Sequence, residues 1–261
     1  MLFWRSGPGT SHGFQNSREN WRVYLLAMNQ SSVAHSVRLF LGCFLMFFGG
    51  ANAFCQQDSK GTVDASNYQL LVKKQKSLQQ GFSRYIVSLR LPDGDRVSSV
   101  FGTDVYPVEL KAPEGVYNSP YNAGWSASGM NPNFFKLMPE MEDDSYATIG
   151  LTTSAQISGI PGAEDPTMVQ DPGLPWDEFF TKSGETQLTI NTHTGGAYFV
   201  LRTAANGAPV NGEVLLMQVT TSGEFSGDLN IQIFPQSDNY DELRWRTSFD
   251  GAGEFSGYFI D

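Results

Sequence analysis

The stretch Leu215-Leu-Met-Gln-Val-Thr-Thr-Ser-Gly-Glu-Phe-Ser-Gly-Asp-Leu-Asn-Ile-Gln-Ile-Phe-Pro235 predicts two β-strands. From residue 225 to 233 every odd position is Phe, Gly, Leu or Ile, and every even position is polar. The first half also has a two-residue period, with positions 215, 217, 219 and 221 on one face. Ser222-Gly223 suits a tight turn, because glycine accepts a positive φ. We therefore expect a β-hairpin with one face on a core and one face in water.

Short runs of large and β-branched residues predict further strands along the chain. They are residues 85–91, 97–101, 105–110, 145–151, 186–190, 197–201, 243–248 and 254–260. Residues 68–80 are ambiguous, because Lys73, Lys74 and Lys76 fit either a solvated helix or the tip of a hairpin. Two long irregular loops interrupt the pattern, at 112–132 and at 152–185, and the second contains four prolines. The expected fold class is all-β, an antiparallel β-sandwich or jelly-roll-like domain with two long irregular loops.

The N-terminal part resembles a secretory signal. Leu39–Phe48 is an apolar run of ten residues, shorter than the ~20 residues that span a bilayer, and Ala51 and Ala53 follow as a small-x-small cleavage motif. We predict a signal peptide over 28–53, starting at Met28, with residues 1–27 as an upstream extension without an assigned fold. A flexible lead-in over 54–67 and a single β-sandwich domain over 68–261 complete the expected organisation. An uncleaved signal anchor is the alternative.

Charge and cysteine content limit the partners. The chain has 17 basic and 27 acidic residues, a formal net charge of −10. Removing residues 1–53 takes away four arginines and one glutamate, which changes the net charge to −13. Such a surface argues against nucleic acid as a partner and suits an extracellular protein or a cation binder. After cleavage the one remaining cysteine is Cys55, which indicates a disulfide-linked partner or a free thiol.

Three stretches together resemble a known kind of secreted module. They are Ser99-Val-Phe-Gly102, Asn131-Pro-Asn-Phe-Phe-Lys-Leu-Met-Pro139 leading to Asp144-Ser-Tyr-Ala-Thr-Ile-Gly150, and Ser226-Gly-Asp-Leu-Asn-Ile-Gln-Ile-Phe-Pro235. This combination resembles an uncharacterised β-rich module of marine bacterial and algal extracellular proteins, and it covers most of residues 68–235. The resemblance implies secretion and a β-rich fold. The module has no established activity, so it implies no site residues.

Acidic turns make calcium the candidate cofactor, because hard cations take several oxygen ligands from flexible loops. No stretch matches the twelve-residue loop of an EF-hand. Ordinary solvated turns are the alternative interpretation. The candidate ligands are Asp93, Asp95, Glu142, Asp143, Asp144, Asp238, Asp241 and Glu242.

The aromatic residues of the two loops form a second candidate site. Tyr117, Tyr121, Trp125 and Trp176 are candidates for a ligand-binding platform, since aromatic rings stack on sugars and other apolar ligands. Large aromatic side chains are mostly buried, so a role in closing the core is the alternative.

Catalytic chemistry has little support in the sequence. His193 is the one histidine after residue 53, and no Gly-x-Ser-x-Gly motif accompanies it. Neither paired histidines nor paired cysteines are available for zinc after cleavage. Carboxylates that face each other across a sugar would permit glycoside hydrolysis, and candidates occur at 140–144 and at 164–178.

These observations favour a secreted, non-enzymatic β-sandwich module that binds an extracellular glycan or protein surface, or has a structural role there, such as adhesion. The two long loops are its expected interaction surface. The first alternative is a calcium-assisted carbohydrate-binding protein. The second is a carbohydrate-active hydrolase that uses paired carboxylates.

Overall fold

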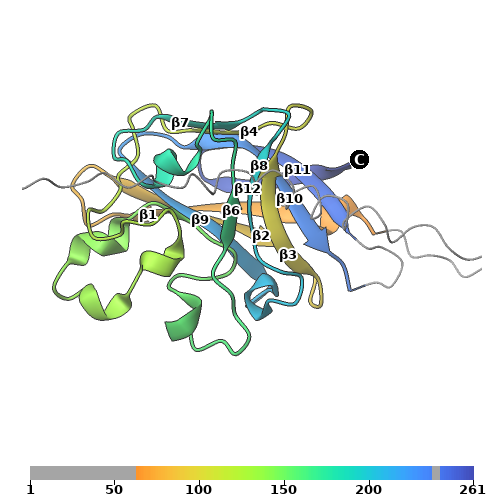
Figure 1. Ribbon diagram of the computed structural model, residues 1–261, viewed down its shortest axis with the longest axis horizontal. Coiled ribbons are helices and arrows are strands. Elements are labelled where there is room, and N and C mark those ends of the chain that lie inside the picture. Colours follow the sequence, from red (N-terminus) through yellow and green to blue (C-terminus); the bar gives the residue numbers. More distant parts are fainter. Residues whose placement is uncertain (1–62, 237–241) are drawn as a thin grey trace, which may run out of the picture. The chain divides into compact units, whose positions relative to one another are not determined.

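The computed structural model describes residues 63–236 and 242–261, which form an all-β domain (Figure 1). Its strands are β1 (Gln69–Lys76), β2 (Ser83–Arg90), β3 (Arg96–Gly102), β4 (Val108–Lys111), β5 (Tyr146–Ala147), β6 (Thr167–Val169), β7 (Gln187–Ile190), β8 (Gly196–Phe199), β9 (Glu213–Thr221), β10 (Ser226–Phe234), β11 (Leu243–Asp250) and β12 (Gly253–Ile260). The helical elements are short 3₁₀ turns: η1 (Ala65–Asn67), η2 (Ala127–Gly129), η3 (Pro132–Phe134), η4 (Pro139–Asp143), η5 (Ala155–Ile157), η6 (Asp177–Phe180) and η7 (Ala205–Gly207). None of the described helices is long and apolar enough to cross a membrane.

The twelve strands form one curled, half-barrel sheet in which every pairing between named strands is antiparallel. The main order is β5-β9-β2-β1-β12-β11-β10-β3-β8-β6, and β4 joins β10 to β7. The all-β, antiparallel part of the sequence prediction is confirmed. The sheet is a single continuous one, so the finer expectation of a sandwich or jelly roll is not confirmed.

Residues 68–80 form the first arm of a hairpin, since β1 pairs with β2 along its whole length. The described part of the expected lead-in contains η1, and Val63 and Ala65 pack against the core. Residues 1–62, with the predicted extension, the signal peptide and Cys55, lie outside the described residues.

The predicted hairpin between residues 215 and 233 is wrong, although both of its strands exist. β9 pairs with β2 and β5, whereas β10 pairs with β11, β3 and β4. Gly223 does not adopt the positive φ that a tight hairpin turn requires. Instead, Tyr117 donates its backbone N–H to Thr220, and Val116 forms a bridge with Thr221. The edge of β9 that the hairpin would have used is therefore occupied, and the chain crosses to another part of the sheet.

Strand β9 is buried on both faces, which differs from the half-wetted strand predicted. The register of β9 shifts opposite Val87 and Ser88, so that Leu216 and Met217 both reach the main core. The opposite face lies under the 112–157 segment, where Leu215 packs on a second small cluster of Ala127, Met130 and Tyr146. The Gln218 amide donates to the backbone carbonyls of Glu142 (3.0 Å) and Asp144 (2.7 Å).

Strand β10 keeps its predicted alternation, because Leu229, Ile231 and Ile233 are fully buried in the main core. Its polar face is only partly wetted. Asn230 is completely buried, and its amide donates to the carbonyls of Phe101 (3.0 Å) and Tyr106 (2.7 Å). Asn230 thereby closes the gap between the two strands, β3 and β4, that share one edge of β10.

Replacing Asn230 by alanine is expected to destabilise the domain by about 1–3 kcal/mol, because buried carbonyl groups lose their donor. Thermal unfolding followed by circular dichroism measures this change. The matched control is Gln187→Ala, which removes an exposed strand amide bonded to Glu109, and it should leave the melting temperature nearly unchanged. Equal melting temperatures for the two variants would contradict the role of Asn230.

Candidate functional site

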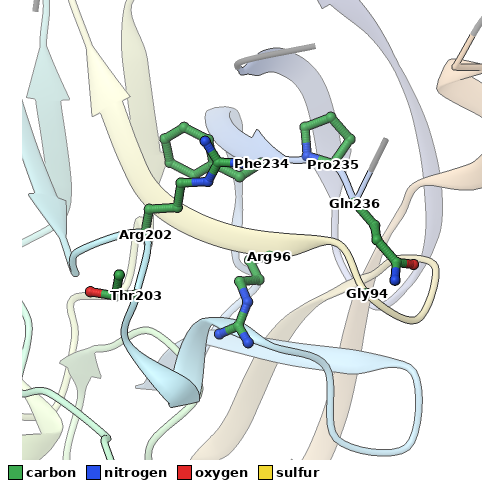
Figure 2. A pocket seen from close by; sticks show the side chains of 7 residues that line it. All are labelled: Gly94, Arg96, Arg202, Thr203, Phe234, Pro235 and Gln236. Atoms are coloured by element: carbon green, nitrogen blue, oxygen red, sulfur yellow. The ribbon is translucent and has the colours of Figure 1, made fainter. Parts of the chain in front are cut away.

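A pocket of about 410 Å³ lies where the start of β3, the end of β10 and the chain after β8 meet (Figure 2). We call it the arginine pocket. It is lined by Gly94, Arg96, Arg202, Thr203, Phe234, Pro235 and Gln236. None of these residues was among the sequence-based candidates.

The strand register brings two of the lining residues together. Arg96 is the first residue of β3 and pairs directly with Phe234, the last residue of β10. Directly paired residues of antiparallel strands project to the same face of a sheet, so this pairing forms one wall of the pocket. Pro235 follows at once, and it has no N–H with which to continue the strand.

The two arginines are held in different ways. Arg96 donates from Nη1 to the backbone carbonyl of Ala204 at 2.9 Å, while the Arg202 guanidinium lies over the Phe234 ring, 4.9 Å from its centroid. Figure 2 shows the Arg202 guanidinium beside the Phe234 ring and the Arg96 guanidinium away from that ring. The two guanidinium groups therefore have different protein contacts.

These two arginines are unusual in this acidic protein. The described residues contain six arginines, and four of them form ion pairs with Asp or Glu: Arg84, Arg90, Arg244 and Arg246. Within the described residues, Arg96 and Arg202 have no acidic partner, and both line this pocket. No acidic side chain of the described residues pairs with these two charges.

The turn before β3 shapes the rim of the pocket. A side chain at Gly94 would overlap the Gln236 amide, and its φ of +95° also favours glycine. Asp95 is buried, and its two carboxylate oxygens accept from the Tyr68 hydroxyl (2.7 Å) and the Gln236 backbone N–H (2.8 Å). Asp95 is thus a connector between strands, and it does not neutralise the arginines.

The predicted aromatic platform is divided between the core and the surface. Trp176 is 2% exposed and packs edge-on against the partly buried Trp125, with ring centroids 5.5 Å apart. Both rings also contact Tyr198 of β8. Tyr121 is 48% exposed, and Tyr117 is half-buried against Phe82. The structure brings the two tryptophans together and leaves the two tyrosines apart from them.

The acidic residues 142–144 attach the mostly irregular segment 112–157 to the sheet. Asp143 is fully buried, and its Oδ2 accepts from the backbone N–H groups of Leu78 (2.8 Å) and Gln79 (3.0 Å) in the β1–β2 turn. Arg84 lies 3.6 Å from the other oxygen of Asp143 and bonds to Glu142 at 2.9 Å. These carboxylates therefore have protein partners.

Asp144 lies in the same anchor, beneath the loop that begins at Tyr117. Its carboxylate accepts from the Ser119 backbone N–H (2.6 Å) and the Asn122 amide (2.7 Å). Burial raises the pKa of Asp144 to about 7, although the hydrogen bonds from Ser119, Asn122 and Ser145 oppose this rise. The carboxyl group thus takes up a proton near neutral pH in the folded protein.

The remaining calcium candidates are scattered. Asp93 is exposed in its turn, and the Glu242 carboxylate accepts from Gln232 (2.6 Å) and Arg244 (2.8 Å). Asp238 and Asp241 lie outside the described residues. Over residues 63–236 and 242–261, no three His, Cys, Asp or Glu residues are grouped so that they could hold a metal ion.

His193 and several acidic residues of the second loop make separate contacts in the described structure. His193 is almost fully exposed and lies 3.3 Å from Asp104. Glu164, Asp165 and Asp171 each accept a backbone N–H bond, from Leu201, Ala155 and Gly173 respectively. Asp177 accepts from the Gln170 amide, and Glu178 pairs with Lys182. These contacts explain the acidic residues as supports of irregular backbone.

Comparison with known proteins supplies no relative, since no family model, curated protein or solved structure matches this chain.

The protonation of Asp144 predicts a specific pH dependence. Because its pKa is higher in the folded state than the ordinary 3.8, the folded state holds more protons on this group between these values, so the contribution of Asp144 to wild-type stability falls as the pH rises from 4 to 7. Asp144→Asn removes this titration. The melting temperature of the variant minus that of the wild type is expected to increase over this range by several degrees and to level off above pH 7. A difference that stays constant from pH 4 to 8 would contradict the assignment.

Proposed function

We propose that this protein is a secreted, non-enzymatic module that binds an extracellular ligand in the arginine pocket. The observation that carries the proposal is a pair of arginines in one pocket that have no acidic partner within the described residues, in a chain with an excess of acidic residues. A cation without an acidic partner favours an anionic ligand. The apolar run and cleavage motif before Phe54 support secretion.

Binding is a better-supported function than catalysis. Several of the candidate carboxylates have protein partners, as expected for structural supports: Glu142, Asp143, Asp144, Asp165 and Asp177 contact backbone groups, amides or a basic side chain. Carboxylate-based hydrolysis and calcium-assisted binding remain predictions from the sequence without a specific contact in their favour. An adhesion role and a Cys55-linked partner likewise stay predictions.

The sandwich-like architecture also belongs to the proposal. The Tyr198 hydroxyl on β8 donates to the Leu216 carbonyl on β9 at 3.0 Å, across the core from one end of the strand order to the other. This contact supports two facing layers within the curled sheet, as in a sandwich.

Secretion is tested with the full chain expressed in a secreting host. We expect the protein in the medium with Phe54 at its N-terminus, determined by mass spectrometry. Retention in the cell, or a secreted chain that still begins within residues 1–27, would contradict secretion by the predicted route.

Binding is tested by applying the secreted protein to an array of extracellular glycans and matrix proteins. The double variant Arg96→Gln/Arg202→Gln serves as the comparison, and glycan products in the supernatant are measured by mass spectrometry. We expect retention that the double variant loses, without new products. Ligand cleavage, or retention that is the same for both proteins, would refute a non-enzymatic module acting through this pocket.

A further inference from the structure

We propose that the arginine pocket selects an acidic oligosaccharide whose neighbouring sugars each carry a carboxylate or sulfate group. This inference rests on the proposed function and names the ligand class for the same site. The evidence is the number of free donors, their direction, and the size and lining of the pocket.

The donors of the two arginines match oxyanions. A guanidinium group has five N–H donors in a planar fork that fits carboxylate and sulfate oxygens. Arg96 uses Nη1 for Ala204, and within the described residues its other nitrogens have no hydrogen-bond partner. Arg202 has none there either, and only the Phe234 ring steadies it. Each arginine therefore keeps several donors for an incoming anion.

The directions of the two side chains favour a ligand with separated charges. Arg202 lies over the Phe234 ring, whereas Arg96 lies away from that ring and donates to the Ala204 carbonyl (Figure 2). Inorganic sulfate offers a single oxyanion group to these two side chains. An oligosaccharide with one acidic group on each sugar can contact both, which makes binding to the second arginine intramolecular and strengthens the complex.

The size and the other lining groups also suit sugar. A volume of about 410 Å³ lies at the lower end of the usual range for small-molecule sites, which accommodates one or two sugar rings. Thr203 and Gln236 are exposed at the pocket and offer a hydroxyl and an amide to sugar hydroxyl groups. Pro235 and the Phe234 ring add apolar surface. Arg202 covers one face of Phe234, so this ring supports the arginine and is not a base-stacking platform.

The negative charge of the rest of the protein limits the length of the anionic ligand that the pocket can bind. A net charge of −10 repels a long, uniformly charged polyanion such as nucleic acid. At physiological salt, charges more than about 8 Å away are screened, whereas contact pairs in a pocket are screened less. The site is thus suited to a short acidic segment, and its affinity should fall as salt is added.

The experiment is calorimetric titration of the full secreted protein with four probes. They are a trigalacturonate, a sulfated trisaccharide, a neutral trisaccharide and inorganic sulfate. We expect one or both acidic trisaccharides to bind about tenfold or more tightly than the neutral trisaccharide and inorganic sulfate, because charged hydrogen bonds are lost with either of the latter. The two acidic probes distinguish carboxylate from sulfate as the recognised group.

Variants connect this affinity to the pocket. Arg202→Gln removes a charge at an exposed side chain, and we expect binding of the acidic probe to weaken about tenfold or more. Arg96→Lys keeps the charge but loses the planar fork, and it should weaken binding as well. The matched control is Lys136→Gln, an exposed basic residue outside the pocket that has no ion pair in the described residues, with an expected change under about twofold. Equal melting temperatures verify that the variants fold.

The outcomes separate this inference from the function on which it rests. Equal affinity for neutral and acidic trisaccharides, with loss of both in Arg202→Gln, would overturn the acidic ligand class and leave a binding module. Inorganic sulfate that binds as tightly as the acidic trisaccharides would overturn the two-arginine contact. Array retention that the double variant does not change would refute the pocket itself and therefore both proposals.

Discussion

The fold and the candidate site depend on strand β10, which is paired along both edges. One edge takes the whole of β11, and the other is divided between β4 and β3. The division leaves the carbonyls of Phe101, near the end of β3, and Tyr106, just before β4, beside the gap, and the buried Asn230 amide donates to both. Arg246 stabilises this amide in turn, with an Nη1 hydrogen bond of 2.7 Å to its oxygen. A buried side-chain amide thus substitutes for ladder hydrogen bonds.

The pairing of β10 also determines the position of the arginine pocket at the C-terminal end of this strand. Because β3 pairs with the last residues of the strand, Arg96 is placed beside Phe234, and Pro235 ends the pairing there. The chain after β8 then passes over this end, with Arg96 bonded to Ala204 and Arg202 stacked on Phe234. Three separate segments of the sequence therefore form the pocket, and the sheet register places two of them side by side.

Sequence reasoning identified the strands better than their partners. Period-two alternation follows from local geometry, and the buried odd positions of β10 agree with it. Pairing is a non-local property, and Ser222-Gly223 looked like a hairpin turn although Val116 and Tyr117 occupy the edge of β9. The extra residue Leu216 in β9 likewise changes which side chains face the core, and a regular alternation pattern does not reveal it.

The difference between local and non-local information also explains why the candidate residues chosen from the sequence are not the residues that line the pocket. Clustered acids attract attention in a sequence, but Asp143 and Asp144 are clustered because a long irregular segment needs acceptors for N–H groups. Arg96 and Arg202 are far apart in the sequence, and the feature that distinguishes them is that neither forms an ion pair within the described residues. Most basic side chains of the described residues have an acidic partner, and only the folded structure reveals that two of those without one line the same pocket. Shared position in the fold, which the sequence does not show, is what distinguishes these two arginines from the exposed Lys136.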